Sequence, residues 1–401
     1  MTRGRRIFWA AMLVLAAAVG VFLATGVLRL PVFNATMAAD SLRARLQMAS
    51  PARADRESLA EAVRLPQGFG IELHARVPAA RSMVLGDRGT LFVGTRKSSV
   101  YAVLDAAGSG PAGEVRVLAD GLRMPNGVAF RDGDLYVAEV SRVLRFEDIE
   151  DRLDAPPEPV VVRGDFPDET HHGWKYIAFG PDGLLYVPVG APCNVCERDD
   201  PRYSAIGRMR PDGSDFEVFA SGIRNTVGLA FHPATGVLWF TNNGRDHMGD
   251  DLPPDTLHRA PRAGMHFGFP SCLAKGLPDP EYGQGRACDG AVYDLPALEM
   301  PAHVAPLGLA FVPSGAWGPE WDGRLLWAEH GSWNRSKPIG YRLGMTTVQG
   351  GRAGDYEIFA DGWLRNNRAW GRPVDLLFLP DGSLLVSDDR AGAIWRIRKN
   401  P

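Results

Sequence analysis

Apolar and polar residues alternate in a unit that recurs along most of the chain. Each unit is a short apolar strand, a turn rich in Gly, Asp and Pro, and a second apolar strand, often followed by a third. Six copies start roughly 40–80 residues apart, which is typical of radially repeated sheets. The copies are SMVLGDRGTLFVGTRKSSVYAV, PNGVAFRDGDLYVAEVSRVLRF, KYIAFGPDGLLYVPVG, VGLAFHPATGVLWFTNNG, LGLAFVPSGAWGPEWDGRLLWAEHG and VDLLFLPDGSLLVSDDRAGAIWRI.

The repeat has a physical reason, which also predicts the fold. One short antiparallel sheet cannot bury both of its faces, but sheets packed radially around an axis bury them against one another. We therefore expect an all-β, six-bladed β-propeller. The stretch GFGIELHARV, from Gly68 to Val77, reads as a strand without a local partner. We predict that it pairs with GAIWRIRK in the last blade and closes the ring.

The N-terminal segment differs in character from the repeats. Arg3, Arg5 and Arg6 precede an apolar run from Ile7 to Leu28, about the length that crosses a bilayer. We predict a cytoplasmic basic flank and membrane anchor (or cleaved signal peptide) over residues 1–31, a stalk over 32–64 and the propeller over 65–401. The basic flank stays in the cytoplasm. The propeller is thus expected on the periplasmic side of the inner membrane.

The four cysteines agree with an exported domain. Cys193 and Cys196 form a CxxC, and Cys272 and Cys288 flank a glycine- and proline-containing loop. An even number of cysteines in an oxidising compartment indicates disulfides, and four cysteines allow three connectivities. A zinc site needs two CxxC pairs or spaced histidines in addition to one CxxC.

Composition narrows the class of ligand. The formal net charge is -3 and the 44 basic residues are dispersed, so nucleic acid is not an expected partner. The positions just before the inner strands are different in kind. They carry polar groups that converge on the axis and suit a ligand with several anionic or carbonyl oxygens. They are His172, Arg224 with Asn225, His303 and Arg372.

These residues lie in motifs that resemble a known family, the glucose/sorbosone dehydrogenases that use pyrroloquinoline quinone (PQQ). The resemblance covers about residues 65–398 and is closer to the sorbosone dehydrogenase-like branch. The combination of SGIRNTVGLAFHP with NNGRDHMGDDLPPD is its most specific part. The other carriers are HHGWKYIAFGPDG, GMHFGFPSC, EHGSWNRSKPIGYRL and GRPVDLLFLPDGSLLVSDD.

The resemblance implies a role for each matching residue. His172 corresponds to the catalytic histidine, which takes the proton of the substrate hydroxyl while hydride passes to the quinone C5. Arg224 and Asn225 correspond to residues that contact the quinone carbonyl oxygens, and Arg224 is expected to stabilise the charge that develops there. Arg372 corresponds to an arginine that pairs with a cofactor carboxylate. Another cation is expected from GSWNRSK.

That further cation is Arg335 or Lys337, and the sequence does not choose between them. NNGRDHMGDDLPPD is implied to be the loop that binds Ca²⁺ through the backbone carbonyls of Gly244 and Arg245, with Asp246 nearby. Oxygen ligands of this kind suit the ion. In one respect the chain departs from the soluble glucose enzymes: Ala191 stands where they have the aspartate that supports the catalytic histidine.

The resemblance therefore implies a PQQ- and calcium-dependent oxidation of a sugar or aldehyde, with a quinone or cytochrome as electron acceptor. Two alternatives stay open. A calcium-dependent lactonase or esterase propeller is one, with Asn126, Asn225 or Asp388 as candidate metal ligands. The other is a membrane-tethered binding propeller without catalysis. Axial histidines and arginines favour a multiply carboxylated cofactor over a bare dication.

Overall fold

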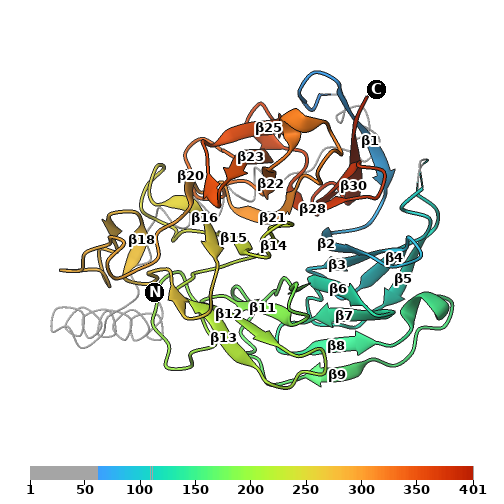
Figure 1. Cartoon of the computed structure of the whole chain (residues 1–401), viewed down its shortest axis with the longest axis horizontal. Helices are drawn as coiled ribbons and strands as arrows, with labels where there is room; N and C mark the ends of the chain where they lie inside the picture. Colours follow the sequence, from blue (N-terminus) through green and yellow to red (C-terminus); the bar gives the residue numbers. More distant parts are fainter. Residues whose placement is uncertain (1–61, 109, 111, 401) are drawn as a thin grey trace, which may run out of the picture. The chain divides into compact units, whose positions relative to one another are not determined.

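The repeating pattern of the sequence forms a ring of six antiparallel sheets in the computed structural model, which describes residues 62–108, 110 and 112–400. Figure 1 shows the sheets around a central axis, with β2, β6, β14, β21 and β28 nearest to it. The predicted six-bladed β-propeller is confirmed. Each predicted repeat supplies the first strands of one blade.

The strands of the first three blades follow in chain order. Blade 1 contains β2 (Ala80–Leu85), β3 (Leu91–Thr95), β4 (Val100–Val103) and β5 (Val115–Ala119). Blade 2 contains β6 (Gly127–Arg131), β7 (Asp134–Ala138), β8 (Val143–Phe146) and β9 (Val160–Arg163). Blade 3 contains β10 (Ala178–Phe179), β11 (Leu185–Val189), β12 (Ala205–Met209) and β13 (Glu217–Ser221), with β17 (Met265–His266) added in parallel to β13.

The other three blades carry the longer insertions. Blade 4 contains β14 (Leu229–Phe231), β15 (Leu238–Asn242), β16 (Pro254–Ala260) and β20 (Leu298–Ala302). Blade 5 contains β21 (Pro306–Phe311), β22 (Arg324–Glu329), β23 (Arg342–Gln349), β24 (Arg352–Ala353) and β25 (Glu357–Asp361). Blade 6 contains β28 (Pro373–Phe378), β29 (Leu384–Asp388), β30 (Ala393–Lys399) and β1 (Phe69–Ala75).

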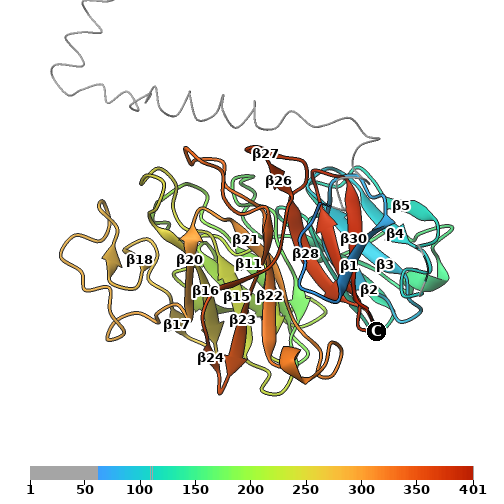
Figure 2. The same cartoon turned by 90° about the horizontal axis from the view of Figure 1, so that it is seen from above.

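Short elements complete the described chain. They are the hairpins β18 (Cys272–Ala274) with β19 (Leu277–Pro278) and β26 (Leu364–Arg365) with β27 (Arg368–Ala369), and the 3₁₀ turns Ile149–Asp151 and Pro319–Trp321. The loop that carries β18 extends outward from the ring beside β20 (Figures 1 and 2).

The ring closes as the sequence predicts. Strand β1 pairs antiparallel with β30, with Phe69 opposite Lys399 and Leu73 opposite Trp395. The last blade therefore combines the first described strand with three strands from the C-terminal end. This pairing leaves the ring without an open seam, so edges that would otherwise be unpaired are covered.

Apolar side chains fill the space between neighbouring blades. Trp317, Trp363 and Trp395 lie in one cluster between blades 5 and 6, and each is nearly fully buried. The inner strands approach one another closely at glycines. A Cβ atom at Gly228 would collide with the carbonyl group of Leu307 in the next blade. Such packing fixes the start of each inner strand relative to the next.

The predicted anchor, residues 1–31, lies outside the described residues, as does most of the predicted stalk. The end of the stalk is described, and there Arg64 forms a β-bridge and an ion pair with Asp361 of blade 5. Over residues 62–400, with 109 and 111 excepted, we find no helix with the length and apolarity to cross a membrane.

Candidate active site

The predicted histidine, arginine and asparagine come together at the end of the propeller where the inner strands begin. Gly190 shows how close they are, since a Cβ atom there would lie 2.6 Å from Cβ of His172 and 3.0 Å from Oδ1 of Asn225. The amide of Ala191 donates to the carbonyl of Arg224 at 2.8 Å. We call His172, Ala191, Arg224, Asn225 and Asp246 the base cluster.

A backbone carbonyl orients His172. Its Nδ1 lies 2.7 Å from the carbonyl oxygen of Ala191, and because that oxygen only accepts, Nδ1 carries the hydrogen. In the neutral ring Nε2 is then the basic nitrogen. Burial, followed by the positive charges of Arg224 and His171, lowers the pKa of His172 well below its ordinary value. The ring is thus neutral near pH 7 and able to accept a proton.

This contact explains the missing aspartate at Ala191. In place of a carboxylate, the carbonyl of that residue holds the imidazole in one tautomer, a role that backbone oxygens often play for histidines. The backbone of His172 also has a φ of +53°, which is uncommon for a residue with a side chain and concentrates at functional sites. His171 is exposed and contacts His172 edge-on at 4.2 Å.

Arg224 is buried, and four of its five N–H donors have partners within the described residues. Its Nε donates to the carbonyl of Asn194 at 2.7 Å, and its Nη1 donates to the carbonyl of Asn243 at 3.2 Å. Its Nη2 donates to Asn194 Oδ1 and to Asp246 Oδ2, both at 2.9 Å. Burial lowers the pKa of Arg224, while the charge of Asp246 opposes the shift. The guanidinium is therefore held in one orientation beside His172.

The predicted calcium loop connects β15 with β16. The amide of Gly244 donates to Asp255 Oδ1 at 2.7 Å, and a second amide, that of Ala305, donates to Oδ2 of the same carboxyl. Burial raises the pKa of Asp255 to about 7. The side chain of Arg245 pairs with Asp279, which is fully buried. Both sides of the Gly244–Arg245 segment are thereby fixed.

The carbonyl oxygens of Gly244 and Arg245 accept no hydrogen bond from any residue in the described ranges. Two unpaired oxygens on a fixed backbone are the kind of ligand that Ca²⁺ takes. Asp246, named with them as a nearby carboxylate, instead pairs with Arg224 and accepts from Asn334 at 3.1 Å.

The two candidates for a further cation differ in their surroundings. Arg335 donates to the backbone carbonyl of Asp250 and pairs with Asp251 at 3.2 Å, so it fastens the blade 5 loop to the predicted calcium loop. Lys337 is exposed, and its side chain makes no ion pair with the residues described here. His303 contacts the carbonyl of Gly249 through Nε2 at 3.0 Å.

A second cluster lies where blades 1, 2, 5 and 6 meet. Arg81 is buried and donates to Asn126 Oδ1 and, at 2.7 Å, to Asp389 Oδ2. Asp389 also accepts from His330 Nε2 at 2.9 Å. Arg372 donates to the carbonyls of His330 and Gly331 at 2.8 and 2.9 Å. We call Arg81, Asn126, His330, Arg372 and Asp389 the closing-blade cluster.

Electrostatics connects the two clusters. Burial raises the pKa of Asp389, but the hydrogen bond from His330 and the charges of Arg81 and Arg372 lower it far below its ordinary value overall. Arg96 interacts with Arg81, Asp389 and Arg372, and its charge is also among those that lower the pKa of His172. The positive charges of Arg224 and Arg96 therefore both act on His172.

Sequence reasoning missed Arg81, Arg96, Trp174, His330 and Asp389. A weak signal for Arg81 was present, because it lies at the start of an inner strand, whereas Arg372 directly precedes one. Arg96 and Asp389 follow second strands of their blades, and no single-chain pattern indicates that their side chains turn toward the axis.

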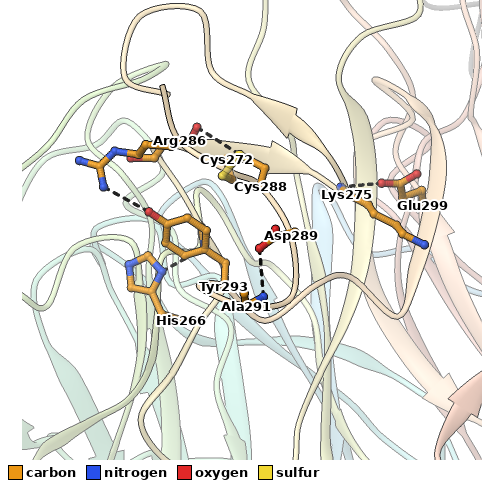
Figure 3. The surroundings of a disulfide bond; sticks show 11 residues. His266, Cys272, Lys275, Arg286, Cys288, Asp289, Ala291, Tyr293 and Glu299 are labelled. Carbon is orange, nitrogen blue, oxygen red and sulfur yellow. Dashed lines mark hydrogen bonds between the residues drawn. A yellow bond between two sulfur atoms is a disulfide. The ribbon is translucent and has the colours of Figure 1, made fainter. Parts of the chain in front are cut away.

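The disulfides connect Cys193 with Cys196 and Cys272 with Cys288, which selects one of the three connectivities. The first lies beside Asn194, which holds Arg224. The second closes the outward loop, where Arg286 donates to the hydroxyl of Tyr293 at 3.4 Å and Tyr293 packs on His266 (Figure 3). An ion pair between Arg245 and the fully buried Asp279 joins this loop to the predicted calcium loop.

The candidate ligands of a hydrolase-type metal site have other partners. Asn126 bonds to Arg81, Ser82 and the carbonyl of Lys175. Asp388 accepts from the backbone amides of Arg372, Arg390 and Ala391. Within the part of the chain that the structure describes, no group of three or more His, Cys, Asp or Glu side chains is placed to hold a metal ion.

Comparison with known proteins places the chain in a family. The family model described as TrAA12-like matches residues 64–400. The chain belongs to this family. Among related sequences, an uncharacterized protein of Borreliella burgdorferi is 28% identical over 361 residues, which cover 85% of this chain and 92% of that one. A PQQ-dependent pyranose dehydrogenase of Coprinopsis cinerea is 30% identical over 125 residues, 26% of this chain and 16% of that enzyme.

Solved structures agree with the propeller fold. The holo form of the pyranose dehydrogenase PQQ domain from Coprinopsis cinerea superposes with a TM-score of 0.70 at 18% identity, covering 84% of this chain and 97% of that one. A calcium structure of a Trichoderma reesei enzyme of carbohydrate-active family AA12 gives 0.73 at 20% identity, with the same coverages. The chain is thus a propeller related to PQQ-dependent sugar dehydrogenases. Membership of the sorbosone branch stays a prediction.

Proposed function

We propose that this protein is a PQQ- and calcium-dependent dehydrogenase that oxidises a hydroxyl of a sugar or of a hydrated aldehyde. The observation that carries the proposal is the state of His172. It is neutral, fixed in one tautomer by the carbonyl of Ala191, and surrounded by arginines at the axial end of the propeller. Relatives that are named for PQQ and calcium support the choice of cofactors.

The residues present fit a tricarboxylate quinone. Arg224 and Asn225 lie beside His172, the charge of Arg96 also acts on His172, and Arg372 is near enough to Arg96 to affect its pKa. Arginine suits carboxylate oxygens because its planar fork donates two parallel hydrogen bonds. The unpaired carbonyls of Gly244 and Arg245 fit calcium. When bound, PQQ supplies a quinone that accepts the hydride of the substrate.

The protein's own residues then have defined tasks. His172 Nε2 takes the proton of the substrate hydroxyl, while Nδ1 keeps its hydrogen and donates it to the carbonyl of Ala191. Arg224, held by Asn194 and Asp246, places a fixed positive charge where oxygen becomes more negative. Because these bonds already exist in the free protein, little reorganisation is needed at the moment of reaction.

Location and electron acceptor are part of the same proposal. Two disulfides support an oxidising compartment outside the cytoplasm. The apolar run from Ile7 to Leu28 supports attachment to the membrane, where a quinone or cytochrome is available to accept the electrons.

A titration tests the function directly. The purified protein is titrated with PQQ in the presence of calcium and then with EDTA, and binding is followed by the cofactor's absorption. Reduction of an artificial dye is next measured with a panel of aldoses and aldehydes. We expect calcium-dependent binding and dye reduction by at least one sugar. Absence of binding at micromolar PQQ contradicts the proposal, and lactone hydrolysis is then the assay of choice.

A further inference from the structure

Arg96 has an unusual setting between β3 and β4. Its guanidinium carbon lies 3.9 Å from the centre of the Trp174 ring, two residues after His172 in sequence. Stacking of this kind holds the plane of the guanidinium without using any of its N–H groups. Within the described residues, no hydrogen bond or ion pair reaches these five donors. The side chain is fixed and yet unpaired.

The other arginines at this end of the propeller are occupied. Arg81 is neutralised by Asp389, Arg224 pairs with Asp246, and Arg372 donates to two backbone carbonyls. Arg96 is therefore the guanidinium among these four that keeps all its donors available. The contrast separates arginines that hold the scaffold from one that is ready for an external partner.

The charges around Arg96 favour an anion. The residue as a whole is exposed, but its guanidinium lies against the Trp174 ring, and this loss of hydration, followed by the charge of Arg81, lowers the pKa of Arg96 to about 10. Arg372 adds to the shift. Asp389 opposes it, but that carboxylate is already shared by Arg81 and His330. Like charges held close together without a matching carboxylate are stabilised when an anion binds between them.

We propose that Arg96, stacked on Trp174, is a carboxylate-binding residue at the axial end and that it receives a carboxylate of the bound cofactor. The inference rests on the proposed function, because it names a contact of the same site. An acidic sugar as substrate presents the same chemical group. The two sources of the carboxylate are separated by experiment.

The test compares four forms of the full-length protein in direct binding of PQQ with calcium present. They are the wild type, Arg96→Ala, Arg96→Lys and Arg262→Ala. Arg262 is a matched control, since it is also an exposed arginine and follows the distal end of β16. We expect Arg96→Ala to raise the Kd for PQQ about 10- to 100-fold, the loss of one charge-assisted pair. Arg96→Lys should recover part of the affinity for PQQ, and Arg262→Ala should leave the affinity unchanged.

A second arm measures binding of glucuronate and glucose to each form by calorimetry. If Arg96→Ala leaves the Kd for PQQ unchanged but weakens glucuronate relative to glucose, the carboxylate belongs to the substrate, and the cofactor assignment is overturned. If neither ligand is affected, the carboxylate site itself is overturned. Failure of the wild type to bind PQQ overturns the proposed function as well, so the two failures are distinguishable. Circular dichroism and thermal unfolding establish that each variant is folded.

Discussion

One histidine in each of the two clusters has a different hydrogen-bonding setting. In the base cluster, Nδ1 of His172 donates to a backbone carbonyl, and Nε2 has no hydrogen-bond partner within the described residues. His330 in the closing-blade cluster uses Nε2 on Asp389, which Arg81 holds in turn. Burial lowers the pKa of both, to about 3 for His330. Burial alone therefore does not make a histidine a base, because an unoccupied ring nitrogen is also needed.

The same distinction applies to the stability of the two clusters. In the closing-blade cluster a buried charge faces a carboxylate, so removal of one partner leaves the other uncompensated. In the base cluster, Nδ1 of His172 donates to a main-chain carbonyl, which a change of side chain does not remove. We therefore expect mutation of His172 to affect activity and mutation of the closing-blade cluster to affect folding.

The largest effect is expected from His172→Ala. Loss of the base should reduce turnover by about 10²–10⁴-fold, the usual contribution of general-base catalysis, while PQQ binding is largely kept. Dye-reduction kinetics and a PQQ titration of the same preparation measure the two quantities. His171→Ala is the control, and its turnover should stay within a few-fold of the wild type. Unchanged turnover in His172→Ala would show that the base lies elsewhere.

Asp389→Ala tests the other side of the comparison. Arg81 would be left buried without its carboxylate, so we expect about 3 kcal/mol of stability to be lost. Urea unfolding followed by tryptophan fluorescence gives the value. Arg64→Ala breaks an exposed pair with Asp361 and should change stability very little. Equal losses in the free energy of unfolding would mean that the closing-blade cluster contributes no more to stability than an exposed ion pair.

The two disulfides should contribute differently, one to stability and the other to cofactor binding. Cys272→Ser with Cys288→Ser opens a loop with a sequence separation of 16, for which loop-closure entropy corresponds to about 3 kcal/mol. The short bridge between Cys193 and Cys196 closes far less chain, but it adjoins Asn194, which holds Arg224. Removal of the Cys193–Cys196 bridge should weaken PQQ binding more, and lower the melting temperature less, than removal of the Cys272–Cys288 bridge. Calorimetry measures both quantities, and the reverse ranking of the two disulfides contradicts this assignment.

Arg372→Ala examines the member of the closing-blade cluster that we assign to the cofactor. Its guanidinium donates only to main-chain carbonyls, so stability should fall less than in Asp389→Ala. We expect the Kd for PQQ to rise about 10- to 100-fold, with recovery of part of the affinity in Arg372→Lys. A normal Kd together with a large loss of stability would place Arg372 in the scaffold.

The smallest effect concerns pH. A histidine with a lowered pKa keeps its basic form down to a lower pH than an ordinary one. In a profile of kcat/KM against pH for the loaded enzyme, the fall in activity on the acidic side should therefore have its midpoint below the ordinary histidine pKa of about 6.5. Arg224→Gln removes the charge next in importance after burial and should move that midpoint upward. A midpoint above pH 7 in the wild type contradicts a neutral His172.

The architecture could be predicted from the sequence. Six strand–turn–strand copies predicted six blades, and the unpaired stretch from Gly68 to Val77 predicted the closing strand, because apolar periodicity and unpaired edges are local properties of the chain. The motifs around His172, Arg224 and Gly244 also indicated where the site lies.

The contacts within the proposed site could not be predicted from the sequence. The carbonyl of Ala191 orients His172, and Arg96 stacks on Trp174 from another blade. Asp389 of blade 6 forms an ion pair with Arg81 of blade 1. These contacts join residues that are far apart in sequence or involve backbone atoms that every residue has. A one-dimensional pattern carries no record of them, since they depend on how the blades are placed around the axis.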